Sequence, residues 1–552
     1  MQPSWLQTVH HDGSEKYVSA RYPRLGEHIR LRLRLSDVAP IRRVYVRVFP
    51  DGEQTFIPMQ AHDHKPPVRW WEADLTITEP VVHYRFVLQA DDGVWWLSAA
   101  GPSGHDPLDM TDFRIVAGDD SLAWLDDAVF YQIYPDRFAN GDPSNDPQPD
   151  EYEYRGHRPH TYPWGSSLPE GAPHTTSFYG GDLIGLVQHL DHLETLGVNA
   201  IYLNPVFTTY SCHRYDPIDY TRVDPHLGGD AALIALRQAL DARGMRYILD
   251  ITPNHCGFKH PWFAAAQADS DAPEADFFTF MRHPDDYLSW LGHMSLAKLN
   301  YSSAELRRRM YGGPDAIFRR WLQPPFGADG WRVDVANMTG RQGALQLNGE
   351  IARGIRAAVK ETRPDAYVMG ENFFDASAQL QGDQWDAVMN YMGLVVPLWH
   401  WLSRYEQGAI GMQESITSPV PFSTAALVAT WRDRRAAIPW SIARQQYNLL
   451  GSHDTHRIRS VVGGNDALHR LAAVVQFTYP GVPGVYYGDE IGMEDAPRQR
   501  AINCMVWDQA QWDRSLFDFY KDLIAFRRRS TVLQRGGFQV LAVEEDTFAY
   551  KR

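Results

Sequence analysis

The chain of 552 residues is longer than one ordinary globular domain, so at least two domains are expected. Hydrophobic residues make up 44% of the chain and charged residues 22%, a composition typical of globular rather than disordered proteins. The formal net charge of -15 argues against a nucleic-acid partner, because nucleic-acid-binding surfaces must neutralise phosphates.

The termini and the cysteines favour a cytoplasmic protein without a membrane partner. Residues 1–7 lack a basic region followed by an apolar run, so no signal peptide is predicted. No apolar run approaches the ~20 residues that a membrane-spanning helix needs. The three cysteines, Cys212, Cys256 and Cys504, follow no metal or redox spacing, and an odd number without a framework indicates a reducing compartment.

Residues 1–118 are predicted to form a β-sandwich. Apolar and polar residues alternate with period two over residues 31–35, 43–49 and 82–88, as half-buried strands require. Turn residues such as Pro50-Asp51-Gly52 separate these segments. Many short strands with turns between them favour a sandwich, and residues 118–121 are expected to form the linker that leaves it.

From residue 125 apolar strands alternate with amphipathic helices, which indicates parallel βαβ units and the α/β class. Helices are expected at residues 182–196, 231–243 and 342–361, among others. No glycine-rich dinucleotide fingerprint follows the first strand, so a closed (β/α)8 TIM barrel is favoured over a doubly wound open sheet. The eight predicted strands are residues 129–134, 200–204, 246–250, 330–334, 366–371, 387–390, 448–452 and 484–487.

Two stretches interrupt the repeat, a long loop at residues 141–179 and an inserted lobe after the third strand. Long insertions on the strand-end side of a barrel usually shape a substrate cleft. At the C-terminus only two strands are predicted, so that segment reads as a shortened β-domain or a remnant of one. The predicted order is an N-terminal β-sandwich (1–118), the first part of the barrel (125–254), the lobe (255–303), the rest of the barrel (304–530) and a C-terminal β segment (531–552).

Polar residues gather at the predicted strand ends. Because the strand ends of a barrel converge on one mouth, these side chains are expected to share a pocket. Charges packed so closely cost stability, which favours a functional site over core packing. A structural ion pair is the alternative for the arginine and its neighbouring aspartate. The residues are Asp250, His255, Arg332, Asp334, Glu371, His453 and Asp454.

Such a pocket suits glycoside hydrolysis, in which one carboxylate attacks the sugar and another protonates the leaving oxygen. Arg332 lies two residues before Asp334 on the same face of the strand, so Asp334 is expected to have a low pKa and to act as nucleophile. Glu371 has no cation beside it in sequence and is expected to be the acid/base. Asp454 is expected to stabilise the transition state, and His255 and His453 to donate hydrogen bonds to the sugar.

These stretches resemble the signature regions of the α-amylase family, glycoside hydrolase family 13. The regions are DITPNH at 250–255, GWRVD at 330–334, GEN at 370–372 and SHD at 452–454, with supporting blocks at 200–207, 213–216 and 481–490. The resemblance covers residues 125–535 and implies a retaining mechanism on α-glucosidic bonds of maltodextrins or related oligosaccharides. It also implies that Tyr215 stacks under the sugar at the cleaved bond, with packing on loop neighbours as the alternative.

The β-sandwich before the barrel resembles the neopullulanase, cyclomaltodextrinase and maltogenic amylase branch. The blocks at 228–231, 290–300, 370–376 and 535–541 are closer still to bacterial maltodextrin glucosidases, so glucose release from short maltodextrins by cleavage of α-1,4 bonds is expected. A neopullulanase- or cyclomaltodextrinase-type hydrolase, or a transglycosylase, is the alternative. Met338 stands where typical neopullulanases carry a glutamate, which should alter how acceptor sugars are held. The resemblance also implies a homodimer formed through the N-terminal domain.

A structural calcium site is predicted near the first barrel strand. Closely packed oxygen ligands suit a hard cation, and the pattern resembles the calcium loop of several enzymes of this branch. An ordinary turn rich in Asn and Asp is the alternative. No organic cofactor is expected. The predicted ligand residues are Asn140, Asp142, Asn145, Asp146, Gly180 and Asp182.

Overall fold

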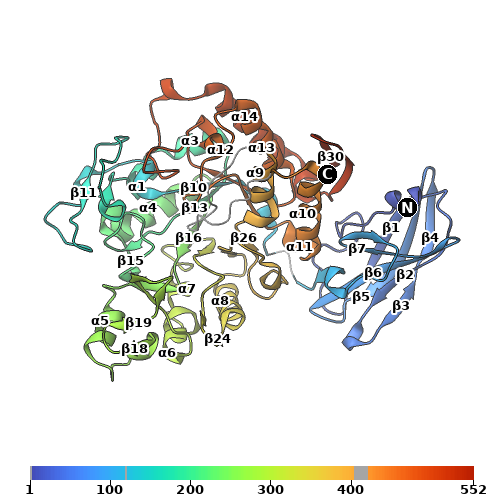
Figure 1. Ribbon diagram of the computed structural model, residues 1–552, viewed down its shortest axis with the longest axis horizontal. Coiled ribbons are helices and arrows are strands. Elements are labelled where there is room, and N and C mark those ends of the chain that lie inside the picture. Colours follow the sequence, from blue (N-terminus) through green and yellow to red (C-terminus); the bar gives the residue numbers. More distant parts are fainter. Residues whose placement is uncertain (1–2, 119–120, 403–420) are drawn as a thin grey trace.

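The computed structural model describes residues 3–118, 121–402 and 421–552. A β-domain built from the N-terminal residues lies to one side of a larger domain that contains the barrel (Figure 1). The chain ends beside this boundary, where the last two strands lie near the N-terminal domain (Figure 1). Asp119 and Asp120 of the expected linker lie outside the described residues.

Two antiparallel sheets make up the N-terminal domain. One sheet has the order β1 (His28–Ser36), β5 (Val68–Thr76), β4 (Gln60–Lys65). The other has the order β3 (Thr55–Pro58), β2 (Ile41–Val48), β6 (Val81–Ala90), β7 (Gly93–Ser98), β8 (Gly101–Ser103), and β9 (Phe113–Val116) also pairs with β6. Alternate residues of both sheets enter one core that is separate from the barrel core, which confirms the β-sandwich.

Eight parallel strands form the barrel, and every residue in them is buried except Arg246. They are β10 (Phe130–Ile133), β13 (Ala200–Leu203), β16 (Arg246–Ile251), β22 (Gly330–Val333), β25 (Tyr367–Gly370), β26 (Ala387–Val388), β27 (Tyr447–Leu449) and β28 (Val482–Tyr486). Their order is β26-β25-β22-β16-β13-β10-β28-β27. A parallel bridge between Met389 and Tyr447 joins the first and last strands and closes the ring. The predicted TIM barrel and its eight strands are confirmed.

The predicted helices exist, but two of them have different bounds. The helix expected at 182–196 is divided at His189 into α2 (Leu183–Gln188) and α3 (Leu190–Leu196). The helix α4 (Gly229–Asp241) agrees with the prediction. The helix expected from residue 342 begins later, as α8 (Asn348–Thr362), because β23 (Arg341–Gln342) and β24 (Leu345–Gln346) first form a hairpin. Gly343 adopts a φ of 55° in that hairpin turn, a conformation that ends any helical path.

The two insertions have their own secondary structure. After β16 the lobe contains a small sheet of β17 (His255–Gly257), β21 (His293–Lys298) and β20 (Ser289–Trp290), together with α5 (Pro261–Ala268). The loop at 141–179 contains the short parallel pair β11 (His160–Thr161) and β12 (Ser177–Phe178). The domain boundaries given above stay predictions.

The C-terminal hairpin of β29 (Gln539–Val543) and β30 (Phe548–Lys551) contacts the N-terminal domain. Phe538 N donates to Asp12 Oδ2 at 2.9 Å, and Arg34 Nη2 donates to Gln539 Oε1 at 2.7 Å. In the part of the chain that the structure describes, no helix has the length and apolar character needed to cross a bilayer.

Candidate active site

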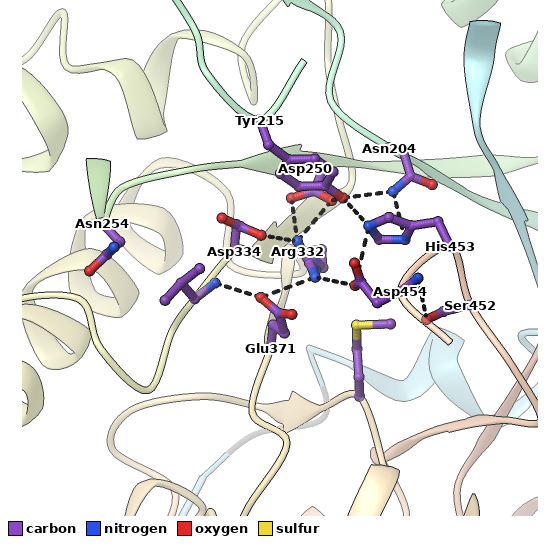
Figure 2. Close-up of polar contacts among 12 residues, drawn as sticks. Asn204, Tyr215, Asp250, Asn254, Arg332, Asp334, Glu371, Ser452, His453 and Asp454 are labelled. Carbon is purple, nitrogen blue, oxygen red and sulfur yellow. Dashed lines mark hydrogen bonds and ion pairs between the residues drawn. The ribbon is translucent and has the colours of Figure 1, made fainter. Parts of the chain in front are cut away.

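Arg332 occupies the centre of the barrel mouth and contacts four carboxylates (Figure 2). Its Nη1 lies 2.8 Å from Asp334 Oδ1 and 3.0 Å from Asp250 Oδ1. Its Nη2 lies 3.2 Å from Glu371 Oε2 and 3.7 Å from Asp454 Oδ2. Arg332 and Asp250 are fully buried, whereas the Asp454 side chain is 24% exposed. The acids from four strand ends therefore meet around one guanidinium, as predicted.

The sharing of one cation among four acids overturns the low pKa predicted for Asp334. Asp334 was expected to have a low pKa because Arg332 is beside it, yet burial and the neighbouring Glu371 raise its pKa well above the ordinary value. Burial likewise raises the pKa of Asp250 to about 6 and raises that of Asp454. One positive charge cannot keep four carboxylates ionised, so the pocket holds at least one proton near neutral pH.

The main-chain conformation after Asp334 fixes the orientation of Glu371. Val335 has a φ of 47°, a strained value for a β-branched residue. In this conformation its N–H donates to Glu371 Oε2 at 2.6 Å. Both the Val335 N–H and the Arg332 guanidinium thus contact Oε2, and neither contact involves Oε1 of Glu371.

A hydrogen-bond network holds His453 in one tautomer (Figure 2). Its Nδ1 accepts from Gln132 Nε2 at 2.9 Å and from Asn204 Nδ2 at 3.0 Å. Its Nε2 therefore carries the proton and lies 2.7 Å from Tyr215 Oη and 3.2 Å from Asp454 Oδ2. Burial lowers the pKa of His453 well below its usual value, so the ring is neutral. Tyr215 Oη in turn donates to Asp250 Oδ2 at 2.8 Å.

The sequence analysis missed several members of this network. Asn204 ends the second barrel strand in the same way that the acids end theirs, and Gln132 is a polar residue inside an otherwise apolar strand. Both signals were visible in the sequence. Tyr202, whose hydroxyl donates to Asp250 Oδ2 at 2.7 Å, had no comparable signal because tyrosines are common in barrel strands.

His255 lies in the site but contacts the protein with both ring nitrogens. Its Nε2–H donates to the carbonyl of Tyr215 at 2.9 Å, and its Nδ1 accepts from Asn254 Nδ2 at 3.1 Å. Asn254 Oδ1 accepts from the buried Lys298 Nζ at 2.5 Å. Trp290 of the inserted lobe stacks on the His255 ring, with 5.5 Å between the ring centroids. His255 therefore positions the Tyr215 segment rather than presenting a free hydrogen-bond donor to a ligand.

A cleft of about 660 Å³ is lined by Tyr215, His255, Asp334, Glu371, His453 and Asp454. The lobe contributes Trp290 and Leu296, and the segment after β22 contributes Met338. An apolar, aromatic wall with convergent polar groups at its base is the usual form of a small-molecule site. A cleft of this shape, with paired buried carboxyl groups at its base, can carry out acid–base and nucleophilic chemistry on a sugar.

The comparisons with known proteins agree with this geometry. The model of the α-amylase catalytic domain matches residues 132–503. The chain belongs to the α-amylase family. A cyclomaltodextrinase from Bacillus sp is 30% identical over 99% of this chain and 93% of its own length. Neopullulanase 2 of Thermoactinomyces vulgaris is 32% identical over 96% of this chain and 86% of its own length. The solved structure of a cyclomaltodextrinase superposes with a TM-score of 0.72 at 30% identity, covering 99% of this chain and 89% of that one.

Within the α-amylase family, these relatives place the chain in the neopullulanase and cyclomaltodextrinase branch of α-glucosidic bond hydrolases. The predicted family and enzyme class are thereby confirmed. The finer resemblance to maltodextrin glucosidases stays a prediction.

The predicted calcium residues of this α-amylase family chain divide into two groups. Asp182 Oδ2 accepts from Asp142 N at 2.9 Å and Asp142 Oδ1 accepts from Ser144 N at 3.0 Å, so these two aspartates fix the loop. By contrast, Asn140 Oδ1 and Asn145 Oδ1 are buried and accept no hydrogen bond from any described residue.

Asp146 is the acid next to Asn140, whose Nδ2 donates to Asp146 Oδ1 at 3.0 Å. Burial raises the pKa of Asp146, and Asp182 and Asp142 nearby add to the effect. Gly180 lies so close that a Cβ there would come within 2.2 Å of Asp146 Oδ1. Unsatisfied buried oxygens around a carboxylate fit a hard cation. Among the described residues, no group of three His, Cys, Asp or Glu side chains could hold a metal ion, so a cation here would depend on the amide oxygens.

Proposed function

We propose that the protein is a retaining hydrolase that cleaves α-1,4-glucosidic bonds of short maltodextrins and releases glucose. The observation that carries this proposal is the contact of Asp334 and Glu371 with adjacent nitrogens of one guanidinium at the base of the cleft. A retaining glycosidase needs two carboxyl groups this close, one to attack and one to protonate.

In the proposed first step, Asp334 attacks the anomeric carbon and Glu371 gives its proton to the leaving oxygen. Arg332 stabilises the ionised form of Asp334 at 2.8 Å. Glu371 carries the transferred proton on Oε1, since Oε2 is held by Val335 and Arg332. In the second step Glu371 takes a proton from a water molecule while the water oxygen attacks the anomeric carbon. The bond from that carbon to Asp334 breaks, and the sugar leaves with retained configuration.

The other predicted residues bind the glucosyl unit or hold Tyr215 in place beneath it. Asp454 accepts hydrogen bonds from its hydroxyl groups and stabilises positive charge on the ring. Tyr215 provides an aromatic surface under the ring, while His453 and Asp250 hold the tyrosine hydroxyl in place. His255 holds the Tyr215 main chain.

Replacing Glu371 by Gln tests this function. The amide cannot give or take the proton, so kcat/KM on maltotriose should fall by ~10²–10⁴-fold, the usual contribution of general acid–base catalysis. The melting temperature should change little, because Gln keeps the size of the side chain. Product chromatography and circular dichroism measure both effects, and near-normal turnover by the variant would contradict the proposal.

A second candidate function is the opening of cyclodextrins or the cleavage of pullulan. This candidate is supported by the similarity of the chain to a cyclomaltodextrinase and to neopullulanase 2. Initial rates on β-cyclodextrin, pullulan and maltotriose distinguish the two candidates, since a glucosidase should favour maltotriose.

We further propose that calcium binds through Asn140, Asn145 and Asp146. The support is the pair of buried amide oxygens without hydrogen bonds among the described residues. The ion would supply charge that compensates Asp146 and would fix the loop after β10.

We propose a cytoplasmic location and a homodimer. The three cysteines are all free and buried, which suits a reducing compartment. The N-terminal domain exposes the apolar side chains of Val38, Leu108 and Met110 at 82%, 71% and 67%, and a second subunit could cover such side chains. Light scattering of the purified protein measures the subunit number.

A further inference from the structure

Arg155 lines the same cleft as Tyr215, Asp334 and Glu371. Its loop follows β10 and Glu371 follows β25, and four steps separate these strands in the closed ring of eight. The loop that carries Arg155 and the segment that carries Glu371 therefore leave the ring of strands at opposite points. Tyr215 follows β13, which pairs with β10.

The main chain holds Arg155 in a conformation that costs free energy. Tyr154 N donates to His157 O at 2.8 Å, and His157 N donates to Tyr154 O at 3.0 Å, so residues 155 and 156 form a two-residue turn. Arg155 has a φ of 54° and Gly156 a φ of 78°, as in a type I′ turn. The first position of such a turn favours Asn, Asp or Gly, and a long side chain there is unusual.

The turn is anchored to the segment that carries Tyr215. The buried Tyr154 donates its hydroxyl hydrogen to Asp216 Oδ2, and its ring lies 5.4 Å from Phe258 of the lobe. Asp216 also accepts from Thr209 Oγ1 at 2.7 Å. The position of Arg155 relative to Tyr215 is thus fixed through Tyr154 and Asp216.

The guanidinium of Arg155 is exposed and has no hydrogen bond or ion pair with any described residue. Its positive charge nevertheless acts on the cleft, because Arg155 adds to the burial that lowers the pKa of His213. A planar cation with five unused N–H donors suits the hydroxyl groups of a sugar.

We propose that Arg155 is a specificity-determining residue that closes the donor side of the cleft to one glucosyl unit. This inference rests on the proposed function, in which Glu371 protonates the leaving oxygen. The leaving group then lies on the side of Glu371, and the transferred unit lies over Asp334 and Tyr215. Arg155 binds the hydroxyl groups at the non-reducing end of that unit and occupies the space of a second one.

The test uses maltotriose that carries ¹³C only in its reducing-end glucose. A cleft closed by Arg155 cuts the first bond from the non-reducing end, which gives unlabelled glucose and labelled maltose. In Arg155→Gly the donor side is open, and cleavage at the second bond gives unlabelled maltose and labelled glucose. The ratio of the two cleavages should shift at least tenfold, since hydrogen bonds to a charged group are worth about 1.5–3 kcal/mol. Initial rates at low substrate limit transfer products.

Glycine suits the turn, so Arg155→Gly should fold at least as stably as the natural chain. The matched control is Arg158→Ala, which removes a nearby exposed arginine that pairs with Asp150 and does not line the cleft. An unchanged cleavage ratio in Arg155→Gly overturns the role of Arg155 and leaves the proposed function intact. Unlabelled maltose with labelled glucose as the main products of the natural chain likewise overturns only the role of Arg155, because glucose is still released, whereas a natural chain that does not cleave maltotriose overturns the proposed function.

Discussion

Arg332 shows why the spacing of residues in a sequence predicts which side chains meet better than it predicts their protonation. The period of two in a strand correctly brought Arg332 and Asp334 together. The same reasoning predicted no cation beside Glu371, yet Arg332 Nη2 lies 3.2 Å from Glu371 Oε2. A pKa depends on every charge in the pocket, and three of these charges come from strands that are distant in sequence.

Asp250 allows a test of this electrostatic picture by pH. In the unfolded chain it titrates at about 3.9, whereas in the folded chain its pKa is about 6. The folded state therefore holds a proton between these values that the unfolded state does not, and wild-type stability is lost as the pH rises through 6. Asn cannot ionise, so the stability of Asp250→Asn relative to wild type should rise as the pH increases from 4 to 6.

Urea unfolding of both proteins from pH 4 to pH 8 measures this effect. The difference in free energy of unfolding should grow in favour of Asp250→Asn between pH 4 and pH 6 and level off above. A difference that stays constant over this range would contradict the raised pKa. Activity of the variant should fall in all conditions, because Tyr215 and Arg332 lose a charged partner.

At the scale of elements, calcium bound by the loop after β10 should stabilise the folded protein. An ion that binds only the folded state stabilises it by about 2.7 kcal/mol at a concentration 100 times its Kd. Millimolar calcium should therefore raise the melting temperature, and EDTA should lower it. Asn145→Ala should remove this response, because it deletes one of the two buried unpaired oxygens.

Asn145→Asp is the matched control for the calcium prediction, since it keeps an oxygen at the same position. Its melting temperature should still respond to calcium. The same response in Asn145→Ala, or no response in the natural chain, would mean that the loop is a turn held by Asp142 and Asp182 alone. Differential scanning calorimetry distinguishes these results.

The strands were easier to predict than the helices for a physical reason. Each barrel strand is buried, so its residues form a continuous apolar run that stands out in the sequence. Helix ends depend on local turns, such as the hairpin at Gly343 and the break at His189, and these change the hydrophobic pattern little. No sequence pattern predicts the role of Arg155, because its positive φ is seen only in the folded turn.

At the scale of the whole molecule, Asp126 joins three parts of the chain. It pairs with Arg21 of the N-terminal domain, with Arg444 before β27 and with Arg535 before the C-terminal hairpin. Asp126 and Arg444 are buried, so removing the carboxylate leaves a buried arginine without its partner. Asp126→Asn should lower the free energy of unfolding by about 3–5 kcal/mol.

The neighbouring Asp127→Asn is the matched control. Asp127 pairs with Arg528 on the surface, where both side chains are more than a third exposed. Such a pair is worth at most about 1 kcal/mol. Urea unfolding followed by tryptophan fluorescence compares the two variants. Equal midpoints would show that Asp126 does not join the domains energetically.

The arrangement of four acids around Arg332 affects how experiments on any one of them are interpreted. Deleting one acid frees part of the guanidinium for the other three, which then ionise at lower pH. The pH–rate profile of each single variant should therefore move even where the deleted group takes no part in proton transfer. Rate losses measured one substitution at a time will overlap, and only double-mutant cycles can separate them.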